Sequence, residues 1–421
     1  VRLYAQETWR LVFEGDHGLE MVQTYLQPIC RFYVQMCDAD NHVVREAACQ
    51  AIAELVRKVK PLSHHNITSL LQALIICFHD ESWPVRDEAC LATGMVCMEY
   101  PKECKDELPL LKERWMEQLT DPIASVRADA AVAIANAVTA YPNEFKQEIV
   151  QYLQNHFNDA KKQPTMTKKA QKELENNIEA HSNSQLYSCG SLAPKLKKAP
   201  PGAGRIGGCS SCIVNRPKQP WETTDGCIGL FSQMIQRGFF GKDDALFTSL
   251  MQQMADVCRV RHFPQANDLR CTLWNHLPDM AEALGKRRFK GLYLEMFLEL
   301  LMQNLDPSHN TFSALSVHAA AACAESLSRL VGPMIFRGRL QNDSQRDIFD
   351  RAMRERNLQN AQRPPAGFSP FEPPLPSTMR MNPNGHHSQV ASAWNPHPRV
   401  AANDVNPVVG SVAWNGHSAA P

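Results

Sequence analysis

Three stretches of sequence decide the fold: Val44-Arg45-Glu46-Ala47-Ala48-Cys49, Val85-Arg86-Asp87-Glu88-Ala89-Cys90 and Val126-Arg127-Ala128-Asp129-Ala130-Ala131. Their arginines are spaced by 41 residues, so the chain carries an internal repeat of that length. After each arginine, small or apolar residues continue at helical spacing: Ala48, Cys49, Ile52, Ala53 and Val56; Ala89, Cys90, Thr93, Gly94 and Cys97; and Ala130, Ala131, Ile134, Ala135 and Val138. The pattern predicts three helices, each with one buried stripe.

A second apolar stripe precedes each of these stretches, at positions i, i+4 and i+8: Ile29, Tyr33 and Cys37; Leu70, Leu74 and Phe78; and Leu111, Trp115 and Leu119. Each unit is therefore predicted to be a hairpin of two helices. The turns between the helices carry Asp40, Asp80 and Asp121. Pro101 and Pro142 should end the second helices of their units, because proline cannot continue the hydrogen-bond ladder.

A hairpin of this length, with aspartate in its turn and Val-Arg opening an alanine-rich second helix, resembles the HEAT repeat of the armadillo-like superfamily. The resemblance implies an all-α fold, a right-handed alpha-solenoid in which stacked hairpins share one continuous core. We expect residues 1–160 to hold three units and the first helix of a fourth, and residues 221–360 to continue the solenoid and end in a capping helix. The fold by itself implies no chemistry.

A polar segment at residues 161–220 interrupts the fourth unit, whose first helix carries Ile149 on its apolar stripe. The segment holds nine lysines and two arginines against three glutamates, so its net charge is +8. We expect a basic flexible insertion, which either contacts an acidic partner or is a solvated loop. Thr224 and Asp225 are predicted to start the delayed second helix, and Cys227 to lie on its buried stripe.

Two other segments have a distinct composition. The stretches 188–195 and 216–221 resemble the connector of a group of eukaryotic HEAT-repeat proteins, a likeness that carries no activity, and Trp221 is expected to dock the end of the insertion on the solenoid. Residues 361–421 are rich in proline and are predicted to be a disordered tail. Trp394 and Trp414 lie there in two similar Ala-Trp-Asn motifs, which are either docking peptides or a chance recurrence.

The charged residues of the turns are expected to be structural. An arginine that opens one second helix should lie beside the turn of the neighbouring hairpin, where its guanidinium can bond the aspartate or free carbonyls. Trp83 lies in a turn where we expect exposure, and the HEAT domains that bind tubulin present aromatic and basic residues there. The matching residues here are His42 and Ala124, which form no basic series, so packing of Trp83 against the neighbouring turn is the competing interpretation.

The cysteines are interpreted as small buried hydrophobic residues of a reducing compartment, because most of the 14 occupy apolar positions of the helical stripes. The alternative is a zinc site formed by Cys209 and Cys212 with Cys189 and Cys227. This set contains only one Cys-x-x-Cys pair, and Cys227 also fits a buried stripe. We therefore predict no metal ligands and no cofactor.

The composition narrows the classes of function. Lys+Arg and Asp+Glu both number 44, so no basic excess favours direct binding of nucleic acid, and no apolar run has the length of a membrane span. None of the 15 histidines is followed by glutamate, the pair that binds iron in a HEAT-like hydroxylase. A metal-dependent enzyme is therefore only a remote alternative, and we predict no catalytic residues.

We predict a non-enzymatic scaffold or adaptor that binds protein partners on the surface of its solenoid, in the cytoplasm or in the nucleus. The alternative is a nuclear-transport or cytoskeleton-binding adaptor that uses the turns between its helices. The chain starts at Val1 without an initiator methionine, so we also expect it to be a fragment of a longer protein.

Overall fold

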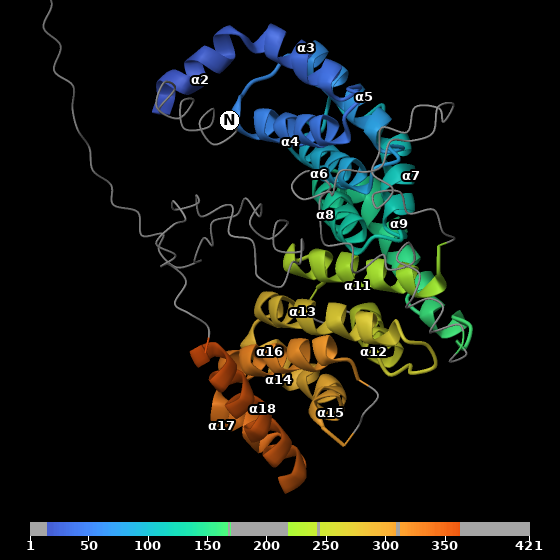
Figure 1. Cartoon of the computed structure of the whole chain (residues 1–421), viewed down its shortest axis with the longest axis vertical. Coiled ribbons are helices and arrows are strands. Elements are labelled where there is room, and N and C mark those ends of the chain that lie inside the picture. The colour runs from blue at the N-terminus through green and yellow to red at the C-terminus, as the bar shows by residue number, and fades with distance from the viewer. Residues whose placement is uncertain (1–14, 167–168, 170–217, 242–244, 309–311, 363–421) are drawn as a thin grey trace, which may run out of the picture.

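A computed structural model describes residues 15–166, 169, 218–241, 245–308 and 312–362, and these residues form helices joined by short turns (Figure 1). The helices pair into hairpins as the repeat predicts, which confirms the all-α class. First helices form an outer layer: α3 (Leu26–Met36), α5 (His64–Cys77), α7 (Leu108–Gln118), α9 (Pro142–His156), α12 (Ala245–Val257) and α15 (Leu294–Leu305). Second helices form an inner layer: α4 (His42–Lys58), α6 (Trp83–Glu99), α8 (Ala124–Ala140), α11 (Pro220–Gln236), α13 (Ala266–Leu284) and α16 (Ala314–Val331).

The hairpins stack into an arc, with the inner helices toward its concave side (Figure 1). Each inner helix packs on the next one along the arc, from α4 to α16. Five further elements complete the arc: α2 (Gly15–Thr24), η1 (Asp159–Lys162), α14 (Lys286–Leu292), α17 (Pro333–Gly338) and α18 (Asp343–Gln362). The apolar stripes lie between the layers in one continuous core, which is the form of a stacked helical-hairpin protein.

The second helices end where the prolines predict. Glu99 and Ala140 are the last residues of α6 and α8, and Pro142 opens α9. Tyr100 and Tyr141, which follow those two helices, also recur at the 41-residue interval and bind the preceding repeat. The Tyr100 hydroxyl accepts from the backbone N–H of Leu62 at 3.1 Å, and the Tyr141 hydroxyl donates to the carbonyl of Pro101 at 2.6 Å.

Close approach between helices depends on two glycines. A Cβ on Gly94 of α6 would lie 2.5 Å from the Cα of Ala133 in α8. A Cβ on Gly226 of α11 would lie 2.1 Å from the carbonyl oxygen of Leu119. Both distances are far below van der Waals contact, so the approach of α6 to α8, and of α11 to the end of α7, requires glycine at these two positions.

Helix α11 begins at Pro220, four residues before the predicted start at Thr224 and Asp225. The prediction was wrong because both residues are buried in tertiary contacts rather than capping the helix. The Glu222 carboxylate instead accepts from the backbone N–H of Gln219 at 2.7 Å, which satisfies an otherwise free N–H at the helix start. The Thr224 hydroxyl accepts from the backbone N–H of Ala160 at 2.8 Å, which ties α11 to η1.

The two ends of the basic segment meet on the solenoid. The Gln163 side-chain amide donates to the Gln219 side-chain oxygen at 3.0 Å, and His262 contacts the Gln163 carbonyl at 2.8 Å. Trp221 is buried and its ring lies against the guanidinium of Arg127, as expected for an anchor of this segment. Most of the basic segment and the proline-rich tail, with Trp394 and Trp414, lie outside the described residues. Within the described part of the chain, every helix is too short or too polar to cross a membrane.

Candidate functional site: the acidic inner surface

Three arginines at the start of inner helices are engaged in structural contacts, as the sequence predicts. Arg45 donates to Asp80 of the next turn at 2.8 Å, and Arg86 donates to Asp121 at 3.1 Å. Both arginines also donate to backbone carbonyls of the turn before their own helix. For example, Arg86 donates to the carbonyl of Asp80 at 3.0 Å. Each guanidinium therefore links two successive hairpins and satisfies free carbonyls.

The third arginine has a different partner. Arg127 donates to Asp225 at 2.9 Å, and Asp225 lies inside α11 rather than in a turn. Asp225 also accepts from the hydroxyl of Thr272 in α13 at 2.6 Å. Arg127 is 2% exposed, against 18% and 14% for Arg45 and Arg86, so this link is the most deeply buried of the three.

Arg270 extends the series beyond the strict repeat and was missed in the sequence. It lies near the start of α13, is buried, and donates to the carbonyl of Cys258 at 3.0 Å. Burial lowers the pKa of Arg270 to about 10. Its place near the start of an inner helix is the signal that could have found it, but the looser spacing of this region hides the repeat.

Four acidic residues lie one or two positions after Arg45, Arg86 and Arg127: Glu46 in α4, Asp87 and Glu88 in α6, and Asp129 in α8. We call these four residues the acidic inner surface. Glu46, Asp87 and Glu88 are half-buried, and Asp129 is 8% exposed. They occur within the same stretches that define the repeat, so their position was visible in the sequence, although sequence reasoning assigned them no role.

The carboxyls of the acidic inner surface have unusual proton affinity. Burial raises the pKa of Asp87 to about 7 and that of Glu88 to about 8, with neighbouring carboxylates, including Glu46, adding to both shifts. Burial together with the charges of Asp87 and Glu88 raises the pKa of Asp129. Negative charge is therefore costly at this place near neutral pH, and a cationic group brought close would favour the ionised carboxyls.

Half-buried apolar side chains continue the same faces along the helices. Leu91 and Met98 lie four and eleven residues after Asp87 in α6, which places them on one side of that helix. Val132 is half-buried in the neighbouring helix α8. Acidic side chains lie at the starts of these helices and apolar side chains lie farther along. Together they could bind a basic segment that also carries apolar side chains.

Trp83 is not exposed, which corrects the expectation drawn from its position in a turn. It is 2% exposed and is the first residue of α6. His42, at the equivalent position of α4, is also buried. In α4 and α6 the first residue is buried in the stack of hairpins, so the turn edge does not present Trp83 to a partner.

Of the four cysteines in the alternative zinc site, the structure describes one. Cys227 is fully buried in α11, in the position that its apolar stripe predicts. Cys189, Cys209 and Cys212 lie outside the described residues.

Comparisons with known proteins do not assign the chain. No protein-family model matches it, and no curated protein matches it.

Proposed function

We propose that this chain is a non-enzymatic scaffold with a right-handed, HEAT-like solenoid, whose acidic inner surface binds basic segments of partner proteins. The 41-residue period and the arginine links between successive turns support the HEAT-like assignment. The raised pKa values of Asp87 and Glu88 carry the binding proposal, because they mark half-buried carboxyls without matching positive charge.

The character of the surface favours proteins over nucleic acids as partners. A lysine or arginine side chain brought close to these carboxyls would favour their ionised form and then be attracted to them, whereas a phosphate group would disfavour ionisation. The adjacent Leu91 and Val132 provide apolar contact area, which a segment with mixed basic and apolar residues can cover. The basic residues 161–220 remain predicted to contact an acidic partner or to be a solvated loop.

Most of the described cysteines are unsuited to nucleophilic catalysis. Burial raises the pKa of thiols such as Cys90, Cys227 and Cys323, so these groups stay protonated and inaccessible at neutral pH. The described cysteines are free thiols, which supports the proposed cytoplasmic or nuclear location. An adaptor that binds through its turns is less well supported, since Trp83 is buried.

A peptide titration tests the proposal on the full chain. A fluorescent peptide with alternating Lys/Arg and Leu would be titrated by anisotropy against the wild type and a D87N/E88Q variant. We expect the variant to bind at least about tenfold more weakly, and wild-type binding to weaken as salt rises.

The matched control is an E113Q/E144Q variant, which removes two exposed carboxylates from the outer helices α7 and α9. This variant should bind as the wild type does. Equal weakening of both variants would mean that the peptide responds to net charge alone, and unchanged binding of D87N/E88Q would exclude the inner surface as the site.

A further inference from the structure

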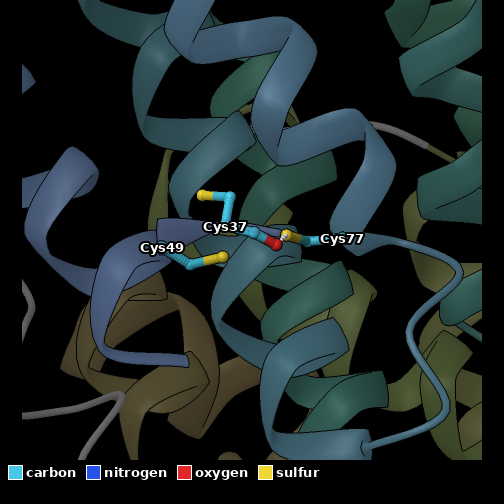
Figure 2. A group of neighbouring side chains, drawn as sticks. All are labelled: Cys37, Cys49 and Cys77. Atoms are coloured by element: carbon cyan, nitrogen blue, oxygen red, sulfur yellow. Dashed lines mark hydrogen bonds between the residues drawn. The ribbon is translucent and has the colours of Figure 1, made fainter. Parts of the chain in front are cut away.

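Three cysteine side chains converge between the first two hairpins (Figure 2). Cys37 follows the last residue of α3, Cys49 lies in α4, and Cys77 is the last residue of α5. Their Sγ atoms all lie within 4.8 Å of one another, and each residue is at most 4% exposed. We call these residues the three-thiol cluster.

The next repeat shows that the fold does not need three thiols at this place. The residues 41 positions later are Phe78, Cys90 and Gln118, which supply one aromatic ring, one thiol and one amide. The Gln118 side-chain amide donates to the Phe78 carbonyl at 3.0 Å, just as Cys77 Sγ lies 3.6 Å from the Cys37 carbonyl. An amide thus makes in one repeat the contact that a thiol makes in the other.

The surroundings of the three-thiol cluster favour a cation. The C-terminal ends of α3 and α5 meet there, and the partial negative charge of a helix C-terminus attracts positive charge. The cluster is also shielded from water, since each of its three residues is at most 4% exposed.

The separation of the sulfur atoms suits a soft metal ion. Thiolates bind Zn²⁺ at about 2.3 Å, so neighbouring sulfurs of a tetrahedral site lie about 3.8 Å apart, and the three Sγ atoms here all lie within 4.8 Å of one another. Thiolates also select Cu⁺, for which three sulfur ligands can be sufficient. We propose that Cys37, Cys49 and Cys77 bind one thiophilic metal ion, Zn²⁺ or Cu⁺, through their three sulfur atoms.

Binding would convert each coordinating thiol into a thiolate, with its proton released to solvent. Zn²⁺ would need a fourth ligand besides the three sulfur atoms, whereas Cu⁺ would not. Because the ligands come from two hairpins, the ion would join the first repeat to the second. This proposal replaces the sequence-based expectation that the chain has no metal ligands, and it concerns different residues from the Cys-x-x-Cys pair.

The test uses the reduced full chain in a C209S/C212S background, which removes the Cys-x-x-Cys pair as a competing site. Zn²⁺ and Cu⁺ are added in separate experiments, with Mg²⁺ as a hard-metal control, and the bound metal is measured after gel filtration. We expect about one Zn²⁺ or one Cu⁺ per chain and no Mg²⁺. Substitution with Co²⁺ should give a thiolate-to-metal charge-transfer band.

Two variants locate the ion. Cys77→Gln installs the residue that the next repeat has at the equivalent position, so we expect this variant to fold, to lose the charge-transfer band and to bind metal at least about tenfold more weakly. Cys90→Ala removes an equally buried thiol one repeat later and should keep the ion. Metal retained by C77Q, or absent from the parent protein, or a disulfide within the cluster in the freshly purified chain, would overturn the proposal.

Discussion

Arg127 and Asp225 lie 98 residues apart in the sequence and form an ion pair of 2.8 Å in which both side chains are almost fully buried. Asp225 also accepts from Thr272, so one carboxylate holds together helices of three successive hairpins, α8, α11 and α13. The ring of Trp221 covers the guanidinium. The pair therefore connects the hairpins on both sides of the point where the long basic segment leaves and rejoins the solenoid.

Replacing Arg127 by alanine should destabilise the protein more than replacing Arg45 or Arg86 by alanine. The R127A variant leaves the carboxylate of Asp225 buried without its cation, for which we expect a loss of about 3–5 kcal/mol in the free energy of unfolding. The R45A and R86A variants remove partly exposed partners and should cost about 1–3 kcal/mol. Urea denaturation of the three variants measures the order of their stability losses. Equal midpoints would contradict this account of the links between arginines and aspartates.

Stability should fall as pH rises through the range in which the acidic inner surface ionises. Asp87 and Glu88 hold their protons to about pH 7 and pH 8 in the folded chain, whereas unfolded carboxyls ionise near pH 4. Between these limits the folded state binds more protons than the unfolded state, so the free energy of unfolding decreases with pH. The D87N/E88Q variant should flatten this decrease and gain about 1–3 kcal/mol at pH 8 relative to the wild type.

The measurement is a series of urea denaturation curves from pH 5 to pH 9, with the E113Q/E144Q variant as control. The control should keep the wild-type slope against pH. A wild type whose stability rises from pH 5 to pH 8 would show that these carboxyls are not buried against one another.

Two glycines of α11 should respond in opposite directions to alanine. In G226A the new methyl group meets the Leu119 carbonyl, and we expect a loss of about 1–3 kcal/mol. In G229A the nearest atom to the new methyl is Ala131 Cβ at 3.7 Å, an ordinary contact, so the higher helix propensity of alanine should stabilise the variant by about 0.5–1 kcal/mol. Thermal unfolding of both proteins checks the contrast, and similar losses would refute the close packing of α11 on Leu119.

Removing the basic segment should leave the solenoid folded if its ends are kept. Gln163 and Gln219 are in direct contact, so residues 167–217 can be replaced by a short Gly/Ser linker without moving α9 or α11. We expect cooperative unfolding with a midpoint close to that of the full chain. A deletion that begins at Gln163 removes a buried side chain and should be less stable, and failure of both deletions to fold would place part of the segment in the core.

The repeat in the sequence predicts the hairpins because each apolar stripe is a local pattern that helix geometry converts directly into a buried face. Contacts between residues that are far apart in the sequence do not appear in such a local pattern. Thr224 and Asp225 resemble a helix start, but Arg127 and Ala160 recruit them into the interior. Burial of Trp83 depends on the neighbouring hairpin, which a pattern within one hairpin does not describe.

The three-thiol cluster could not be predicted from a local pattern either. Cys37, Cys49 and Cys77 are separated by 12 and 28 residues, so no short motif joins them. Aligning the repeats would have been the useful signal, because Cys37 matches Phe78 and Cys77 directly precedes Phe78. The convergence becomes visible only when the first two hairpins are stacked.

The separation of α9 from α11 also has a consequence during synthesis. A ribosome that adds roughly 5–20 residues per second needs several seconds between the end of α9 at His156 and the start of α11 at Pro220. During that interval the emerging chain holds Arg127 and the apolar stripe of α9 without their partners. Nascent chains stalled in this interval should therefore recruit chaperones that bind apolar surface, and chains stalled beyond α13 should release them.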